Sequence, residues 1–270
     1  MKKMNADYLL SSDEEKDRQQ LQSLFWESDA EAMLDQIGVR VGWKCIDLGC
    51  GAIGILGLLA RWVGIQGRIV GVDFDESHLK VAQTYLEQEN LNFVELRQAD
   101  VTNSGYQSNM FDLVHSRFLL PFIDNPESLL NEMIRLAKPG GTIALEESDH
   151  SSWKFYPLCP EWGRLLRVCE DTFALKSDLN MGRKTFYMLR KAGLKDVKVR
   201  ASVKALQDEH PYMRMVLTGV EAIRNRAVDT GITTDEELDK LVQAVEQCVS
   251  DPNRIQITFT LIQVWGQKAK

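Results

Sequence analysis

The sequence lacks several patterns that would define a protein class at once. The chain contains no C-x-x-C pair, which disfavours a disulfide framework or a zinc site and favours reduced thiols in the cytoplasm. No apolar run approaches the roughly 20 residues of a membrane span, and no apolar core of a signal peptide follows the opening MKKMNAD. We therefore expect a cytoplasmic protein with neither a membrane span nor a metal site. The five cysteines are Cys45, Cys50, Cys159, Cys169 and Cys248.

Basic residues are also fewer than acidic ones. Lysine and arginine total 32 against 39 aspartates and glutamates, which gives a net charge of -7. A surface dedicated to nucleic acid would be basic, so we expect no nucleic-acid partner. The length of 270 residues and a hydrophobic fraction of 44% suit one large α/β domain, with or without a cap.

Strand and helix patterns alternate from residue 44 onward. Buried strands are expected at KCIDLG, RIVGVDF, FVELRQAD, FDLVHSRF and GTIALEES, with helical patterns between most of them. A helix is expected at 126–138, because Pro126 follows the capping residue Asn125. Strands separated by helices predict a parallel sheet with helices on both faces.

The two ends of the chain follow different patterns. Two short helices precede the first strand. Alternating segments at 196–206 and 254–265 predict two strands that close the edge of the sheet, the last one antiparallel. Two helices between these strands predict either a cap over the ligand-binding end or a dimer interface.

The segment CIDLGCGAIG, at 45–54, contains glycines in the spacing G-x-G-x-x-G. Ligands of open α/β sheets bind at the carboxyl ends of the strands, and glycines let the backbone approach them closely. Asp47 changes the expected ligand, because a carboxylate there repels a diphosphate and attracts an ammonium or sulfonium group. The alternative is that Asp47 only caps the turn.

Two further acids end the second and third strands. Asp73 follows the glycines by about 20 residues, where a carboxylate can accept hydrogen bonds from a ribose diol. Asp100 is placed to accept from the amine of an adenine, with Val101 beside the ring, although a simple turn cap is the alternative. Together the acids suggest an adenosine ligand.

These motifs, in this order, resemble those of the class I S-adenosylmethionine-dependent methyltransferases, and the small-molecule members that act on quinones and natural products are the most similar. The resemblance extends over about 41–197. The motifs are VGWKCIDLGCGAIG, IVGVDFDESHL, RQADV, FDLVHSRFLLPFIDNPESLLNEMIRLAKPGG and LRKAGLKDV. One departure is Ala52-Ile53, where many members carry a hydroxyl side chain before glycine.

The resemblance implies S-adenosylmethionine as the cofactor and assigns its contacts. The methionine end is assigned to the glycine turn, the ribose to the second strand, the adenine to the third, and backbone contacts near the sulfonium to Arg117. An N-terminal lid would add Tyr8, with Arg18 and Gln22 nearby. The implied cofactor residues are Tyr8, Asp47, Gly49, Cys50, Gly51, Asp73, Phe74, Asp100, Val101 and Arg117.

The implied fold is a Rossmann-like, doubly wound and mostly parallel sheet of seven strands. We expect an N-terminal helical lid at 1–40, a core at 41–207 plus 253–270, and a helical cap at 208–252. The chain would act as a monomer or homodimer.

Two other functions remain open at this point. A nicotinamide-dependent oxidoreductase also fits the glycine spacing, and Tyr187-x-x-x-Lys191 matches the pair found in short-chain dehydrogenases. The helix carrying that pair leads into an edge strand, however, far from the expected site. The second alternative is a protein that binds the cofactor or a partner without turnover.

Methyl transfer needs the acceptor atom, methyl group and sulfur in line, with water excluded. Some acceptors also need a base. His150, after the fifth strand, is the main candidate, and His115 in the fourth strand is the alternative. We expect a small organic acceptor, and Trp153 and Tyr212 as its contacts, because aromatic side chains suit a planar or lipophilic molecule.

Overall fold

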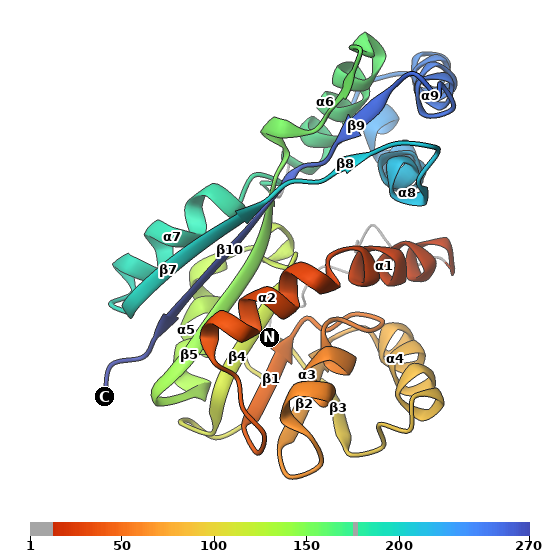
Figure 1. Cartoon of the computed structure of the whole chain (residues 1–270). Helices are drawn as coiled ribbons and strands as arrows, with labels where there is room; N and C mark the ends of the chain where they lie inside the picture. The colour runs from red at the N-terminus through yellow and green to blue at the C-terminus, as the bar shows by residue number, and fades with distance from the viewer. Residues whose placement is uncertain (1–12, 175–177) are drawn as a thin grey trace.

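The computed structural model describes residues 13–174 and 178–270 and contains one large mixed sheet (Figure 1). Five neighbouring strands are parallel, and β10 is antiparallel to both of its neighbours, β5 and β7. The predicted seven-stranded sheet with an antiparallel last strand is confirmed. In spatial order the strands are β3 (Val94–Gln98), β2 (Arg68–Asp73), β1 (Lys44–Leu48), β4 (Phe111–Arg117), β5 (Ala137–Asp149), β10 (Thr260–Gln267) and β7 (Lys195–Ser202).

Helices cover both faces of this sheet. Alternate residues of each strand point to opposite faces, so Cys45 joins one buried apolar cluster and Ile46 the other. One face packs against α2 (Glu27–Ile37), α3 (Leu56–Val63) and α4 (Glu76–Gln88). The other packs against α5 (Pro126–Leu136) and α7 (Gly182–Lys191). Asn125 caps α5 by accepting from the Glu127 amide, as predicted.

A second, three-stranded sheet continues the first beyond the carboxyl end of β5. It contains β6 (Lys154–Tyr156), β9 (Ile255–Ile257) and β8 (Ala205–Leu206), in the same order as β5, β10 and β7. Each of the two alternating segments that the sequence presented as single strands is therefore two strands. The breaks at 203–204 and 258–259 let the chain pass from one sheet to the other, and alternation alone does not reveal them.

A third apolar cluster packs around the small sheet. Its helices are α6 (Pro160–Ala174), α8 (Met215–Asp229) and α9 (Asp235–Val249), and α1 (Asp13–Phe25) lies between α8 and the end of the main sheet (Figure 1). The predicted cap at 208–252 contains α8 and α9, and α6 packs against both. Within the described part of the chain, every helix is too short or too polar to cross a bilayer.

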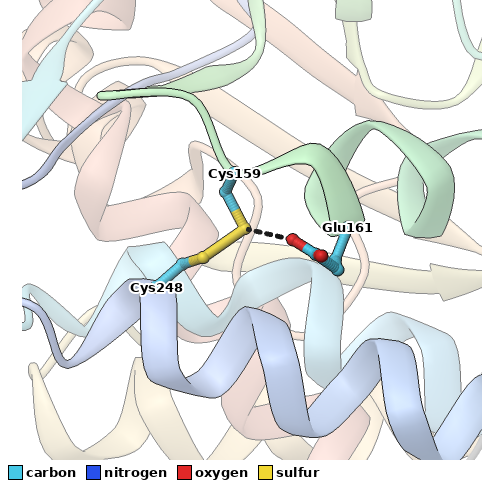
Figure 2. Close-up of side chains that lie close together, drawn as sticks. All are labelled: Cys159, Glu161 and Cys248. Carbon is cyan, nitrogen blue, oxygen red and sulfur yellow. Dashed lines mark hydrogen bonds between the residues drawn. A yellow bond between two sulfur atoms is a disulfide. The ribbon is translucent and has the colours of Figure 1, made fainter.

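A disulfide between Cys159 and Cys248 ties the segment before α6 to the last turn of α9 (Figure 2). The expectation of reduced thiols is wrong for this pair, because the fold brings together two residues that are 89 positions apart. No spacing rule detects such a pair. Glu161 lies beside Cys159, but sulfurs bonded to each other are not thiolate ligands for a metal.

Reduction should destabilise the protein, since the disulfide closes a long loop and restricts the unfolded chain. We expect a loss of about 2–4 kcal/mol in the free energy of unfolding. Denaturant unfolding with and without reductant measures it. The Cys248→Ser variant should have the same free energy of unfolding as the reduced protein, and added reductant should not change it. Equal stability of the oxidised and reduced forms would contradict the prediction.

Candidate functional site

A cavity of about 220 Å³ opens at the carboxyl ends of the first five strands. One end is formed by the turns after β1, β2 and β3, and the other by the segment after β4, the start of the small sheet, α6 and α8. Seven of the predicted cofactor residues line the first end: Asp47, Gly49, Cys50, Gly51, Asp73, Phe74 and Val101.

The glycine turn has the backbone conformation that its glycines permit. Gly49, Gly51 and Gly54 have φ values of +74°, +55° and +55°, a region that other residues rarely adopt. A Cβ on Gly51 would lie 2.7 Å from Oε1 of Gln19, and one on Gly54 would collide with the Asp47 carboxylate. The turn therefore needs glycine at these positions, and all three glycines line the cavity with bare backbone.

Helix α1 lies against this turn. The Ala52 amide donates to Gln19 Oε1 at 3.1 Å, so a side chain from α1 meets the turn at the position where the sequence departs from the usual motif. Arg18 and Gln22 also line the cavity. Sequence reasoning chose Arg18 and Gln22 but missed Gln19, for which no motif exists. Tyr8 lies outside the described residues.

Asp47 is held from inside the protein. Its Oδ1 lies 2.8 Å from Nδ1 of His115, and its Oδ2 accepts from the Ile55 amide at 3.2 Å. The second ring nitrogen of His115 lies 2.9 Å from Glu146 Oε1. Burial alone would lower the pKa of His115, but the two carboxylates outweigh it and raise the pKa to about 9. The ring is an imidazolium at neutral pH.

The prediction of His115 as an alternative base is wrong. The ring is fully buried, is absent from the cavity lining, and has a carboxylate on each nitrogen. Such a ring has no free nitrogen to receive a proton from an acceptor. Its position inside β4, between two other strands, leaves it a structural role.

Asp73 is the last residue of β2, and both of its carboxylate oxygens accept hydrogen bonds from backbone amides. Oδ2 accepts from the Gly51 amide and Oδ1 from the Asp75 amide, each at 2.9 Å. A carboxylate oxygen accepts more than one hydrogen bond, so capacity for a diol remains. His78, for which the sequence offered no role, is buried and lines the cavity with its Nδ1 3.9 Å from Asp73 Oδ1.

The third strand contributes less than expected. Val101 is buried and lines the cavity. The carboxylate of Asp100 is exposed and accepts from the amide and hydroxyl of Thr102, at 2.8 and 2.7 Å. This is the turn-cap arrangement, and Asp100 is not part of the lining. Its contact with adenine stays a prediction.

The segment after β4 is anchored by a buried acid. Glu147 Oε1 accepts from the amides of Leu119 and Leu120, at 3.0 and 2.9 Å. Burial raises the pKa of Glu147 to about 8, so the group is mostly protonated at neutral pH. The anchor holds a segment whose Phe118 and Phe122 side chains line the cavity.

The side chain of Arg117, and not only its backbone, contacts the glycine turn. Its Nη2 donates to the carbonyl of Gly54 at 3.1 Å, while Nη1 is buried and has no hydrogen-bond partner among the described residues. Arg117 lines the cavity. The sequence prediction considered only backbone contacts at this residue.

The other end of the cavity is apolar and aromatic. Phe259, which no motif indicated, packs against His150 and Trp153 with ring centroids 5.5 and 5.3 Å apart. Ser148, His150 and Gly219 also line this end, and Arg18 of α1 reaches it by donating to Met215 Sδ at 3.6 Å, but most of its side chains are hydrophobic. The hydrophobic residues are Phe118, Leu119, Pro121, Phe122, Ile123, Trp153, Leu166, Cys169, Phe173, Leu179, Met215, Val216 and Phe259.

His150 and Trp153 both line the cavity, and their contact with an acceptor stays a prediction. Burial lowers the pKa of His150 to about 4, and neighbouring Asp149 only partly opposes this shift. The ring is therefore neutral at physiological pH. His150 Nδ1 and Trp153 Nε1 are buried and have no hydrogen-bond partner in the part of the chain that the structure describes.

Tyr212 does not reach the cavity. It is fully buried, stacks on Phe25 at 3.7 Å, and its hydroxyl accepts from Trp26 Nε1 at 2.7 Å. Its expected role in substrate binding is wrong, because helical spacing predicts burial but not which buried face meets the ligand. The residue belongs to the packing between α1 and the segment before α8.

The positions of Tyr187 and Lys191, away from the cavity, exclude them as the catalytic pair of an oxidoreductase. Tyr187 is 69% exposed on α7, and Lys191 Nζ lies 3.1 Å from Glu127 Oε1. Neither residue lines the cavity. The pair therefore has no access to a bound cofactor.

A Rossmann-like sheet whose glycine turn and buried acids open into one cavity defines an enzyme that binds a nucleoside-derived cofactor. The chain belongs to the methyltransferase family, because the family model for the methyltransferase domain matches residues 40–202. Together with the ordered motifs, the match identifies a class I S-adenosylmethionine-dependent methyltransferase of the small-molecule type, as predicted. The cofactor prediction is confirmed through the family.

Three relatives illustrate the similarity. Demethylmenaquinone methyltransferase of Geobacillus stearothermophilus is 30% identical over 190 residues, or 66% of this chain and 80% of the relative. A methyltransferase structure from Bacillus halodurans has a TM-score of 0.60 at 18% identity, covering 89% and 99% of the two chains. Phosphoethanolamine N-methyltransferase 2 of Haemonchus contortus, solved with S-adenosyl-L-methionine, has a TM-score of 0.55 at 19% identity, covering 88% and 52%.

The His115 pair should make stability depend on pH. Since the folded pKa of about 9 exceeds the ordinary 6.5, the pairing stabilises the fold fully below pH 6.5 and is lost as pH rises through 9. We expect the free energy of unfolding to fall by about 3 kcal/mol over that interval from this residue. Denaturant melts at several pH values, with NMR titration of the imidazole, test it. A His115 signal that titrates near 6.5 would refute it.

Proposed function

We propose that this protein transfers the methyl group of S-adenosylmethionine to a small, largely apolar organic acceptor by in-line displacement. The observation that carries the proposal is the single cavity with a glycine-and-acid end and an aromatic end. The first end suits the cofactor and the second the acceptor, so the two molecules would meet between Gly49 and Phe118. When bound, the cofactor supplies an electrophilic methyl group on a positively charged sulfur.

The protein's own groups would hold the reactants and keep water out. The acids of the first end face the polar parts of the cofactor, while the aromatic end excludes water from the transfer. Helix α1, which contacts both the glycine turn and α8, would act as the lid. The helices α6, α8 and α9 would form the cap over the acceptor.

The acceptor would be planar and lipophilic, of the quinone or quinol kind. The aromatic lining favours flat rings, and a relative 30% identical over 190 residues is named for action on demethylmenaquinone. A quinol hydroxyl beside His150 would meet a neutral imidazole, the form that accepts a proton; because its pKa of about 4 makes this ring a weak base, the proton would move only as the acceptor attacks the methyl carbon. Removing that proton increases the electron density that attacks the methyl carbon.

Two measurements test the proposal directly. Calorimetry should detect binding of S-adenosylmethionine and S-adenosylhomocysteine. Labelled cofactor should transfer its methyl group to a reduced demethylmenaquinone with a short side chain. If neither cofactor form binds, the proposal fails. If both bind but only another metabolite becomes labelled, the acceptor assignment fails and methyl transfer stands.

Replacing Asp73 should weaken the cofactor site. Asp73→Ala removes the carboxylate that orients the Gly51 amide and faces the ribose, so we expect S-adenosylhomocysteine to bind at least about 10-fold more weakly. Asp75→Ala is the matched control. Asp75 caps α4 outside the cavity, so its loss should cost about 1 kcal/mol of stability and leave binding intact. Equal affinity of wild type and Asp73→Ala would remove Asp73 from the site.

Replacing His150 should affect turnover and leave the cofactor site intact. We expect His150→Gln to lower kcat by about 100-fold or more with a quinol acceptor, with S-adenosylhomocysteine affinity unchanged. Because the pKa of His150 is about 4, the ring stays neutral between pH 8 and 5. Protonation of His150 should therefore not lower the wild-type kcat over that range. His210→Gln, outside the cavity, is the control. A His150→Gln variant with normal kcat would exclude the base.

A further inference from the structure

Phe259 is the common neighbour of aromatic rings around the apolar end of the cavity. Its side chain is only 3% exposed and lines the cavity. The ring centroids of His150 and Trp153 lie 5.5 and 5.3 Å from its own. Phe118, after β4, and Trp26, between α1 and α2, lie at 5.7 and 5.2 Å. One side chain therefore joins three segments that are far apart in the sequence.

Hydrogen bonds hold the backbone on both sides of Phe259. The Ser152 hydroxyl donates to the Thr258 carbonyl at 2.9 Å and lies 2.9 Å from the Thr260 hydroxyl oxygen. The Thr258 amide donates to the Lys204 carbonyl, and the Lys204 amide donates to the Thr258 hydroxyl, both at 3.0 Å. The break between β9 and β10 is therefore braced by two neighbouring segments, and this bracing fixes the position of the Phe259 ring.

The imidazole of His150 depends on aromatic contacts for its orientation. Its Nδ1 is buried and has no hydrogen-bond partner in residues 13–174 and 178–270. The imidazole stacks on Phe259 with an angle of 27° between the planes, and Trp153 meets it at 79°. Phe259 therefore sets the plane of the imidazole. Since Nδ1 is buried, Nε2 is the nitrogen that can face an acceptor.

We propose that Phe259 is a positioning residue for methyl transfer, whose ring fixes the imidazole of His150 beside the acceptor and keeps water from it. The proposal depends on the proposed function, because Phe259 acts through the base assigned there. A base is effective only within hydrogen-bond distance of the proton that it accepts. A displacement of about 1 Å can lower the rate about 100-fold.

The same packing controls the charge of the imidazole. Burial lowers the pKa of His150 to about 4, and two acids, each paired with a basic side chain of α7, only partly oppose this shift. They are Asp149, paired with Arg183, and Asp178, paired with Lys184. Loss of the Phe259 ring would admit water beside the imidazole, so the pKa of His150 should rise toward the ordinary 6.5.

NMR titration of the His150 imidazole tests this packing without any acceptor. The wild-type ring should titrate near pH 4, and Phe259→Leu should raise the midpoint by about one pH unit. Phe259→Tyr, which keeps the aromatic ring, should remain close to the wild type. Phe155→Leu is the matched control, because Phe155 is buried in the same apolar cluster but does not line the cavity. An unchanged midpoint in Phe259→Leu would overturn the proposal.

A measurement on the wild type makes the test independent of how the variants fold. Nuclear Overhauser effects should connect the ring protons of His150 with those of Phe259, which lie in stacked rings. Absence of these effects, or a wild-type midpoint near 6.5, would overturn the proposal.

Steady-state kinetics with a reduced short-chain demethylmenaquinone tests the effect on the reaction. Phe259→Leu should lower kcat by about 10- to 100-fold and change the acceptor KM and the affinity for S-adenosylhomocysteine by less than about 3-fold. Phe259→Tyr should recover most of the kcat. In Phe259→Leu, kcat should also fall as the pH is lowered toward 5, because the imidazole becomes protonated. Equal losses of kcat in Phe259→Leu and Phe155→Leu would assign Phe259 a purely structural role and contradict the proposal.

Failure of the proposed function can be distinguished from failure of this inference. A wild type that binds neither S-adenosylhomocysteine nor S-adenosylmethionine contradicts both. A His150→Gln variant with normal kcat removes the base and this inference, while methyl transfer stands. A wild type that transfers methyl groups with a kcat that Phe259→Leu does not lower contradicts this inference alone.

Discussion

The imidazolium of His115 between Asp47 and Glu146 is the interaction on which the site depends. It lies inside the sheet and joins three adjacent strands, β1, β4 and β5, through two charged contacts below 3 Å. Glu146 in turn accepts from Gln263 on β10, and Gln263 donates to the carbonyl of Asp29 on α2. Breaking a buried pair of this kind leaves an uncompensated charge, so the carboxylate at the glycine turn is fixed by the core of the sheet.

This network also changes the electrostatic argument for the cofactor. From sequence, Asp47 is a bare negative charge that attracts a sulfonium. In the structure an imidazolium 2.8 Å away, which Asp47 shares with Glu146, offsets part of that charge, so Asp47 contributes less to the choice of ligand than its position suggests. Among the described residues, Asp73 has only backbone amides at hydrogen-bond distance, and the nearest histidine nitrogen lies 3.9 Å away. We propose that the cofactor is recognised by Asp73 together with the bare backbone of the glycine turn.

The sequence was sufficient for the sheet and for most of the cofactor end, because both follow from short-range patterns. Strand ends, glycines and terminal acids recur at fixed spacing, and they located Asp47, Asp73 and Val101 correctly at the cavity. It was insufficient where partners come from distant segments. The contact of Gln19 with the glycine turn and the pairing of Cys159 with Cys248 depend on how helices pack, which no local spacing encodes.

The apolar end of the cavity lies at the breaks that separate the two sheets. His150 and Trp153 lie between β5 and β6, and Phe259 lies between β9 and β10, so three lining residues occupy the breaks where the chain leaves the main sheet. Residues of α6 and α8, which pack around the small sheet, complete this end of the lining. Alternation of apolar residues continues across each break, which is why the strands looked unbroken. We propose that the glycine turn and the acid at the end of β2 hold the cofactor, while the residues at these breaks contribute to the choice of acceptor.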